Sequence, residues 1–407
     1  MKRVKRRDFV KVAAASPLLV SPFNQFGTIL KEEQGPITRA DQSADPWLEI
    51  NLENIAWNIR QIRKQASNLP VMAVIKANAY GHGLLEIARF LENQDVDWLA
   101  VGKTSEALTL REGGIKKPIL NFGPFTKEEA KGIVTHQISQ SVYTTDFNWL
   151  AKAARSTGNK ASVHIKVDTG LGRVGVEHYK ALPLVEEISR AKEIKIDGIF
   201  SPLTEHTEFD KEQVVRFNEV CESSVEKGID PGLKHMASSA GVLSYPASHM
   251  DMVRPGIALY GQYPSTREYE LQRIELKPAM TLKSRIIYIK ILHPGDTVSY
   301  HCSFTAKHTM QVATIPTGYS DGYSSRIGEK GEVLIRGVRC PIIGLVTSNH
   351  FVADVTSLKE VKRNDEVVLF GKQVMEEITV EEVATWADTS VYKILIWMNP
   401  LLPRIYV

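Results

Sequence analysis

Short apolar runs alternate with amphipathic stretches from Trp47 to about Pro264, and this alternation constrains the fold more than any other feature of the chain. Alternation of this kind is typical of strands joined by helices in a parallel sheet. About eight such units fit into this part of the chain, which is the number in a (β/α)8 TIM-type barrel. The expected strands lie at residues 47–50, 71–75, 98–102, 118–122, 163–167, 196–200, 233–237 and 252–259.

The pattern changes after about residue 270. Runs of alternating β-branched residues, separated by Gly or Pro turns, occur at residues 284–290, 311–316, 332–335 and 366–370. Such runs predict antiparallel strands. We therefore expect an α/β protein in which residues 46–270 form the barrel and residues 271–407 form a mostly antiparallel β domain.

The N-terminus has the composition of a targeting segment. Lys5-Arg6-Arg7-Asp8-Phe9 resembles a twin-arginine export signal, and a modestly apolar stretch follows it. Targeting segments lie outside the fold. We expect a signal over residues 1–26, a polar linker over 27–45, and export to the periplasm. The alternative is a disordered basic tail.

Charge and cysteine content narrow the range of partners. The net charge is +3, of which the first eleven residues contribute +5, so the remainder carries about −2. That balance predicts no nucleic-acid-binding face. The three cysteines suggest no disulfide framework, and the lack of a run of about 18 apolar residues predicts no membrane-spanning helix.

Lys76 follows five apolar residues, Val71–Ile75, where a buried strand would favour another apolar side chain. An ammonium in low dielectric either pairs with an anion or loses its proton. A deprotonated amine attacks aldehydes, which is how a lysine holds pyridoxal phosphate (PLP) as a Schiff base. The alternative is a lysine that extends to solvent at a strand end.

The sequence around Lys76 resembles the PLP-lysine motif of the alanine racemase family. Three further motifs resemble that family, in the same order and at similar spacing, and the resemblance runs from Trp47 to the C-terminus. The four motifs are Lys76-Ala-Asn-Ala-Tyr-Gly-His-Gly83, Asp168-Thr-Gly-Leu-Gly-Arg-Val-Gly175, Val253-Arg-Pro-Gly-Ile-Ala-Leu-Tyr-Gly261 and Gly318-Tyr-Ser-Asp-Gly-Tyr323. The resemblance implies a PLP-dependent racemase of L- and D-alanine that works as a homodimer on a small amino acid.

The resemblance also implies catalytic and substrate-binding roles. Lys76 and Tyr319 of the partner subunit would transfer protons on opposite faces of the substrate. Arg173 would bind near the substrate carboxylate, and Asn349 occupies a position that shapes the carboxylate pocket. Lys166 matches a lysine that is often carbamylated in this family, where the resulting anion orients the arginine.

A second group of residues matches the family's cofactor contacts. Tyr80, Ser239, Gly256 and Ile257 match the phosphate-binding cup, and Arg254 matches the arginine directed at the pyridine nitrogen. A guanidinium cannot accept the ring proton, so it would keep the ring neutral.

Three positions depart from the family pattern. Pro202 replaces a histidine that stacks on the pyridine ring, for which His206 is a possible substitute. Asn349 replaces part of a Met-Asp pair, and Pro400 stands where we expect a tyrosine that helps bind phosphate and narrows the entrance. These departures leave open a broad-specificity racemase, a D-amino-acid dehydratase, or a PLP-binding protein without turnover.

Two other patterns carry little weight. Gly170-Leu-Gly-Arg-Val-Gly175 fits a dinucleotide-binding fingerprint, but a lone match is weak and the preceding Asp168 would repel a pyrophosphate. His301, Cys302 and His350 lack a recognisable metal-ligand spacing, so the sequence predicts no metal site.

Overall fold

The computed structural model describes residues 45–407 of the chain. The export signal expected over residues 1–26, and all but the last residue of the expected linker, lie outside the described residues. Among the described residues, no helix is both long enough and apolar enough to cross a membrane.

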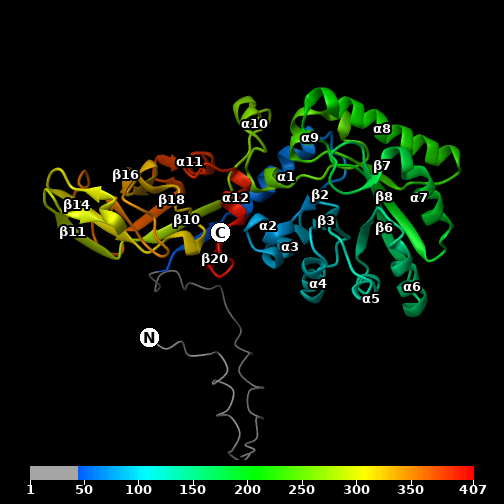
Figure 1. Cartoon of the computed structure of the whole chain (residues 1–407), viewed down its shortest axis with the longest axis horizontal. Coiled ribbons are helices and arrows are strands. Elements are labelled where there is room, and N and C mark those ends of the chain that lie inside the picture. Colours follow the sequence, from blue (N-terminus) through cyan, green and yellow to red (C-terminus); the bar gives the residue numbers. More distant parts are fainter. Residues whose placement is uncertain (1–44) are drawn as a thin grey trace, which may run out of the picture. The chain divides into compact units, whose positions relative to one another are not determined.

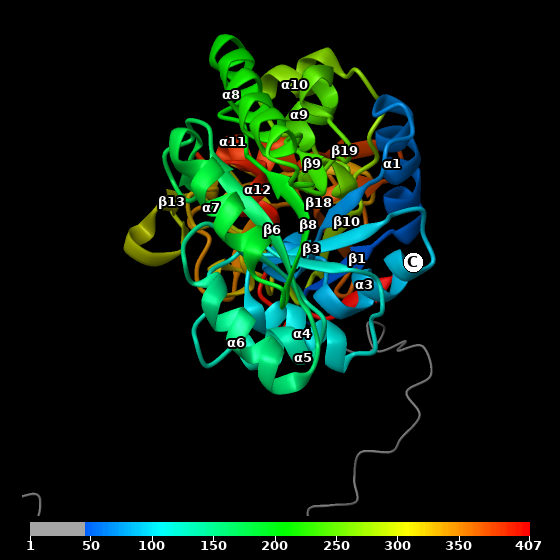
Figure 2. The ribbon, with the colours of Figure 1, turned by 90° about the vertical axis from the view of Figure 1, so that its right-hand side faces the viewer.

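The first domain is a parallel barrel (Figures 1 and 2). Seven parallel strands follow one another as neighbours: β2 (Met72–Val74), β3 (Trp98–Val101), β4 (Ile119–Asn121), β5 (Ser139–Val142), β6 (Ala161–Asp168), β8 (Ile194–Phe200) and β9 (Leu233–His235). The segment around Val253 closes the circle. Val253 pairs with Val71, and its carbonyl accepts a hydrogen bond of 2.8 Å from the Met72 N–H, while the Arg254 N–H donates to Ala237 on the β9 side. The expected (β/α)8 architecture is therefore confirmed.

Helices surround these strands, as Figure 2 shows. The longer helices bury apolar residues on one side; in α3, for example, Ile87, Ala88 and Leu91 are buried at helical spacing. The helices of this domain are α1 (Leu52–Gln65), α3 (Leu84–Glu92), α4 (Thr104–Glu112), α5 (Ala130–Thr135), α6 (Phe147–Thr157), α7 (His178–Arg190), α8 (Thr207–Glu226), α9 (Ser239–Ser244) and α10 (Thr266–Leu271), and a short strand, β7 (Val176–Glu177), pairs with β6.

Three strands differ from the sequence prediction. The run at residues 47–50, β1 (Trp47–Ile50), is not a barrel strand; it pairs with β10 and β20 in the second domain. The barrel instead contains β5, whose Ser-Gln-Ser-Val sequence has too little apolar character to be recognised. The Gln140 amide of β5 is buried but paired, since its oxygen accepts from Asn121 and its nitrogen donates to Gly123, whereas the buried Ser141 hydroxyl has no hydrogen-bond partner among the described residues. The expected strand at 252–259 is also shorter, because the chain turns after Val253 into a 3₁₀ helix, η3 (Ile257–Tyr260).

The second domain is a mostly antiparallel sheet, as predicted. Its strand order is β11-β14-β17-β16-β15-β18-β10-β1-β20, and only the β1–β20 pair is parallel. The strands are β10 (Met280–Arg285), β11 (Tyr288–Leu292), β14 (Met310–Ile315), β15 (Glu332–Ile335), β16 (Val338–Ile343), β17 (Phe351–Asp354), β18 (Glu366–Gln373), β19 (Glu376–Ile378) and β20 (Arg404–Tyr406), with β12 (Thr297–Val298) and β13 (Phe304–Thr305) forming a separate pair. Two helices, α11 (Val380–Trp386) and α12 (Val391–Ile396), follow β19.

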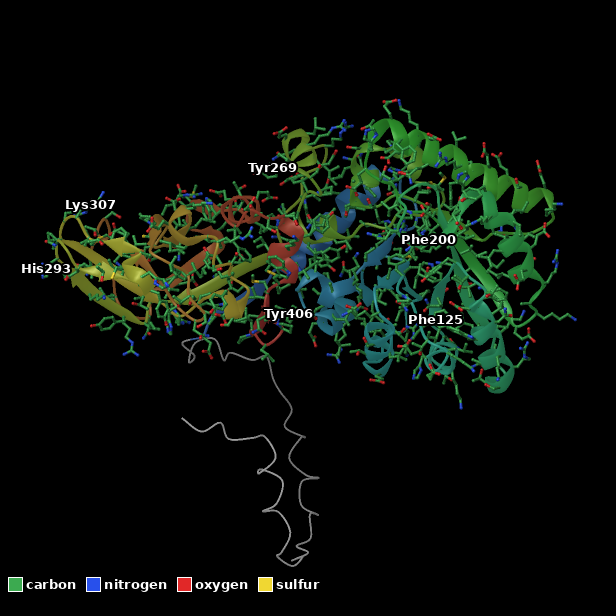
Figure 3. All side chains as sticks on the ribbon, viewed as in Figure 1. Phe125, Phe200, Tyr269, His293, Lys307 and Tyr406 are labelled. Atoms are coloured by element: carbon green, nitrogen blue, oxygen red, sulfur yellow. The ribbon has the colours of Figure 1, made fainter. Side chains whose placement is uncertain are left out.

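The C-terminal strand connects the second sheet to the segment that carries Lys76. Tyr406 of β20, labelled in Figure 3, donates a hydrogen bond of 2.9 Å to the His82 carbonyl. Arg404 of the same strand donates through Nε to the Gly81 carbonyl at 2.8 Å. The backbone after Lys76 is therefore held by residues more than 300 positions later in the chain.

Candidate active site

A cavity of about 570 Å³ lies at the carboxyl ends of the barrel strands, where barrel folds place their active sites. It brings together eight of the residues that the sequence marks as functional. They are Lys76, Tyr80, Lys166, Arg173, Ser239, Arg254, Gly256 and Ile257.

The segment labelled α2 (Lys76–Tyr80) places Lys76 in this cavity. Ala77, Asn78 and Ala79 all have left-handed backbone angles, with φ between 52° and 57°. Left-handed geometry costs a non-glycine residue about 1–2 kcal/mol. Glu106 offsets part of that cost, because its carboxylate accepts from the Asn78 N–H at 3.2 Å and from the Gly102 N–H at 3.0 Å.

The surroundings of Lys76 favour a neutral amine. Burial lowers the pKa of Lys76, and the positive charges of Arg173 and Arg254 lower it further, while Glu106 opposes them. The side chain nevertheless remains accessible within the cavity. Lys76 therefore combines a lowered pKa, which favours the nucleophilic neutral form, with room for a reaction partner.

One wall of the cavity is suited to an anion. The Ser239 hydroxyl oxygen accepts hydrogen bonds from the Gly256 N–H at 3.0 Å and from the Ala258 N–H at 3.2 Å, which leaves its own proton to donate to a ligand. A Cβ atom at Gly256 would lie 2.5 Å from the Tyr80 hydroxyl, so only glycine allows this close approach. Backbone N–H groups, hydroxyls and a glycine together are typical of a phosphate cradle.

Tyr392, on α12, is a cavity residue that the sequence analysis missed. Its ring centroid lies 6.2 Å from that of Tyr80, and burial raises its pKa, so its phenol stays protonated as a donor. The expectation that Pro400 leaves the pocket without a tyrosine is therefore wrong. The tyrosine of the cavity lies eight residues before Pro400, on α12 rather than next to Arg404.

Arg254 is buried and is held by hydrogen bonds from one of its terminal nitrogens. It is only 8% exposed, and its Nη2 donates to the Ser201 carbonyl at 3.1 Å and to the Met236 carbonyl at 2.7 Å. Its Nε atom is buried and has no hydrogen-bond partner among the described residues. Burial lowers the pKa of Arg254 to about 10, which still keeps the guanidinium charged at neutral pH.

Lys166 lies deep in the same cavity. It is 8% exposed, and its Nζ atom lies 5.8 Å from the ring centroid of Phe200, a barrel residue labelled in Figure 3. Burial, followed by the charges of Arg173, Arg254 and Lys76, lowers the pKa of Lys166 to about 8. Four basic side chains around one cavity attract anionic groups of a ligand.

Pro202 lines the cavity at the position of the expected stacking histidine. His206 does not replace that histidine, because it is not among the lining residues and its ring nitrogen accepts from the Phe209 N–H at the start of α8. The wall beside Arg254 is instead aromatic: the ring of Phe200 lies 5.2 Å and that of Phe122 5.6 Å from the guanidinium carbon.

Tyr319 and Asn349 are not among the residues that line this cavity. Both belong to the second domain, on two adjacent loops. The Tyr319 N–H donates to the Thr347 carbonyl at 3.0 Å, and the Asn349 amide donates to the Ser320 hydroxyl at 2.8 Å. Tyr319 is 57% exposed. The fold therefore brings these two residues close to each other but not to Lys76 of the same chain.

The residues present fit PLP. The Ser239–Gly256 cradle suits its phosphate, the unpartnered Arg254 Nε suits a ring nitrogen, and Lys76 suits its aldehyde. Within residues 45–407, no group of three or more His, Cys, Asp or Glu side chains could hold a metal ion.

Comparison with known proteins agrees with this geometry. Family models described as alanine racemase, N-terminal domain, and alanine racemase, C-terminal domain, match residues 50–264 and 279–406. The chain is 38% identical to an alanine racemase of Desulforamulus reducens, over 89% of this chain and 98% of the relative. It is 37% identical to one of Methanococcus maripaludis, over 88% and 98%.

Solved structures give the same result. An alanine racemase of Clostridium difficile 630 matches with a TM-score of 0.84 and 33% identity, over 90% of this chain and 96% of that chain. The alanine racemase of Bacillus anthracis with bound L-Ala-P matches with a TM-score of 0.83 and 30% identity, over 90% and 95%.

Proposed function

This chain belongs to the alanine racemase family, and from that premise we propose that it interconverts L- and D-alanine with PLP as its cofactor. It is an isomerase. The observation that carries the proposal is the combination of a lysine of lowered pKa with an anion cradle and a buried, unpartnered arginine donor in one cavity.

Five residues would hold the cofactor. Tyr80, Ser239, Gly256 and Ile257 would bind its phosphate, and Arg254 Nε would donate to its ring nitrogen without giving up a proton. When bound, PLP supplies a reactive carbonyl carbon for an amino group and a ring that withdraws electron density from the α-carbon.

Racemisation needs one proton-transfer group on each face of the α-carbon. Lys76 Nζ would accept or return the proton on one face, helped by its lowered pKa. Tyr319 of the partner subunit would serve the other face through its hydroxyl. Arg173 would hold the substrate carboxylate, with Asn349 completing the carboxylate pocket from the second domain.

We further propose that the active enzyme is a homodimer in which each cavity receives the partner's Tyr319. The exposed position of Tyr319, away from the cavity of its own chain, supports this arrangement. Carbamylation of Lys166 would turn a cation into an anion beside Arg173, and so relieve the crowding of positive charge.

Broad specificity is the second candidate function, supported by Asn349 at a position that would shape the substrate carboxylate pocket. Tyr392 opposes it, because an aromatic ring narrows the cavity. A pocket that discriminates by apolar volume alone rejects one extra methylene by only about 1–3 kcal/mol, so small and medium side chains remain candidates beside alanine, the leading substrate.

The test is a panel of single L-amino acids followed by chiral chromatography. We expect yellow protein that converts L-alanine to D-alanine, and Lys76→Ala should lose both the colour and the activity. Comparable rates with larger side chains would favour the broad-specificity candidate, and accumulation of keto acid would favour the dehydratase. A colourless protein that PLP cannot restore would contradict all of these.

We also propose that residues 1–26 direct export to the periplasm by the twin-arginine route. That route carries folded proteins, which suits an enzyme that acquires PLP in the cytoplasm. Replacing Arg6-Arg7 with Lys-Lys should retain the protein in the cytoplasmic fraction. An unchanged distribution between periplasm and cytoplasm would contradict the proposal.

A further inference from the structure

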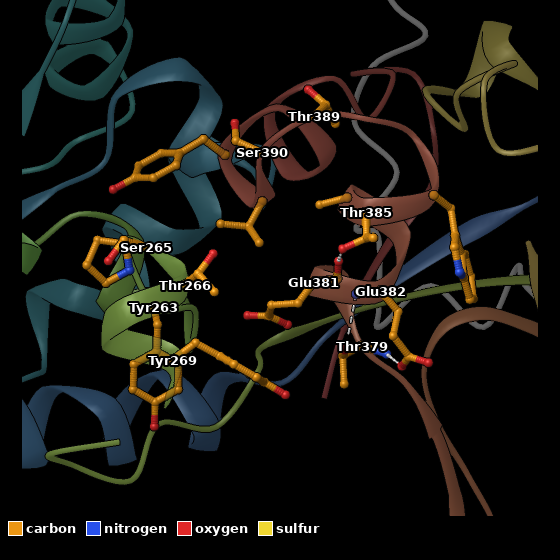
Figure 4. A pocket seen from close by; sticks show the side chains of 15 residues that line it. Tyr263, Ser265, Thr266, Tyr269, Thr379, Glu381, Glu382, Thr385, Thr389 and Ser390 are labelled. Atoms are coloured by element: carbon orange, nitrogen blue, oxygen red, sulfur yellow. Dashed lines mark hydrogen bonds between the residues drawn. The ribbon is translucent and has the colours of Figure 1, made fainter. Parts of the chain in front are cut away.

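A second cavity of about 500 Å³ lies between the Tyr263–Tyr269 segment and helices α11 and α12 (Figure 4). Only one of its lining residues, Tyr392, also lines the PLP-fitting cavity. The family motifs and the proposed mechanism leave the remaining lining residues without a role.

A single unpaired carboxylate dominates the charge of this cavity. Figure 4 shows the Glu381 side chain pointing from α11 into the space, toward the segment that carries Thr266. Burial raises the pKa of Glu381, and the neighbouring charges of Glu377 and Glu382 raise it further, whereas a hydrogen bond from its own backbone N–H lowers it. Among the described residues, no other side chain forms a hydrogen bond or ion pair with this carboxylate.

The other acidic residue is already engaged. Glu382 accepts from the Thr379 N–H at 2.8 Å in the capping box of α11, and it pairs with Arg339 at 2.9 Å. None of the fifteen lining residues is Lys, Arg or His. The lining therefore includes one carboxyl group without a side-chain partner among the described residues, and no basic side chain.

Aromatic rings form much of the remaining wall. Tyr263 and Tyr269 meet edge to face, with centroids 5.8 Å apart, and Trp386 and Tyr392 line the cavity from the two helices. The Tyr263 ring is fixed, because its hydroxyl donates to the Ile274 carbonyl at 2.8 Å. Ring faces attract cations, most strongly when the cation is weakly hydrated.

We propose that this cavity is a binding site for an organic cation with an apolar body, such as an alkyl- or arylammonium ion. The Glu381 carboxylate would pair with the charge and the rings would surround the body. A free amino acid fits poorly, because its own carboxylate would meet no cation and would face Glu381. The site is thus distinct from the substrate site, although its occupant would contact Tyr392.

Calorimetry on the PLP-loaded, full-length protein tests the proposal, with benzyltrimethylammonium as the probe. This ion has no N–H bond and cannot condense with the cofactor, so its binding is independent of turnover. We expect it to bind at least tenfold more tightly than benzyl alcohol and benzoate, which have related bodies but no positive charge. Equal binding of the three probes, or no binding of the cation, would overturn the proposal.

Two variants locate the site. Glu381→Gln, which keeps the shape and removes the charge, should weaken binding of the cation at least tenfold, whereas Glu329→Gln, an exposed glutamate of the same domain, should not. Unchanged affinity in Glu381→Gln would overturn the proposal. Should that variant fail to fold, Tyr269→Leu, which removes one aromatic ring, serves as the test instead. A severalfold loss of affinity for the cation would support the site, and unchanged affinity would contradict it.

Discussion

At the scale of single residues, the main feature of the candidate site is the concentration of basic side chains in one cavity. Lys76, Lys166, Arg173 and Arg254 line one cavity. Burial lowers the pKa of both lysines, and the charges of the two arginines lower it further. The arginines cannot release a proton at neutral pH, so the lowered pKa values affect protonation only at the two lysines. Two amines of lowered pKa in one cavity are unusual for a structural ion-pair network and typical of a reactive site.

The pKa of about 8 at Lys166 leads to a prediction about carbamylation. Only the neutral amine reacts with CO₂, so at constant dissolved CO₂ the modified fraction should fall as the pH is lowered through about 8. The carbamate signal in ¹³C NMR with labelled bicarbonate measures that fraction. The signal should be absent from Lys166→Met, and a signal that persists in this variant, or that does not respond to pH, would contradict the prediction.

At the scale of elements, the left-handed turn after Lys76 is the decisive feature. Consecutive left-handed residues are strained, yet hydrogen bonds to α4, α3 and β20 hold this turn. Glu106 of α4 accepts from the Asn78 N–H, and the Asn78 side chain accepts from the Leu84 N–H at the start of α3. Arg404 of β20 donates to the Gly81 carbonyl. Strain that the surrounding structure maintains is common at functional sites. Here the left-handed turn changes the direction of the chain, so that Lys76 and Tyr80 line the same cavity.

This strain can be measured by a glycine substitution. Ala77→Gly removes a Cβ from a residue with φ of 55°, so relief of about 1–2 kcal/mol should offset the entropy cost of glycine. We expect the free energy of unfolding in urea to stay the same or to rise by up to about 1 kcal/mol. Ala153→Gly in the right-handed helix α6 is the matched control and should lose about 1 kcal/mol. Equal losses in both variants would argue against strain at Ala77.

At the scale of the whole molecule, one chain holds two incomplete halves of the proposed site. The barrel cavity contains Lys76 and the cofactor-binding residues, whereas Tyr319 and Asn349 lie exposed on the second domain. A two-fold dimer, in which the same surfaces meet twice, would complete two sites at once.

Mixing inactive variants tests that arrangement. Lys76→Ala and Tyr319→Phe should each be inactive or nearly so, the latter while keeping its cofactor colour. Co-expressed, they should recover up to about one quarter of wild-type activity, since about half of the dimers are mixed and each mixed dimer has one intact site of two. Racemisation measured on the purified mixture decides this, and no gain over the separate variants would exclude a shared site.

Much of the fold was predictable because hydrophobic periodicity is a local property. Strands such as β2 and β3 are apolar on both faces and could be found from sequence. β5 could not, because its burial depends on hydrogen bonds that Gln140 makes to neighbouring strands. β1 was found as a strand but assigned to the wrong sheet, since its partners β10 and β20 lie more than 200 residues away.

The sequence by itself determined the element types, the order of the two domains and the family motifs that carry the proposed reactive residues, because these depend on side-chain chemistry and short-range pattern. Only the tertiary structure decided that Tyr392 joins the cavity, that Tyr319 does not, and that the Arg254 Nε is buried without a partner among the described residues. These outcomes depend on long-range packing, because they require contacts between segments that are far apart in the sequence. No single segment carries the information that decides which surfaces face one another.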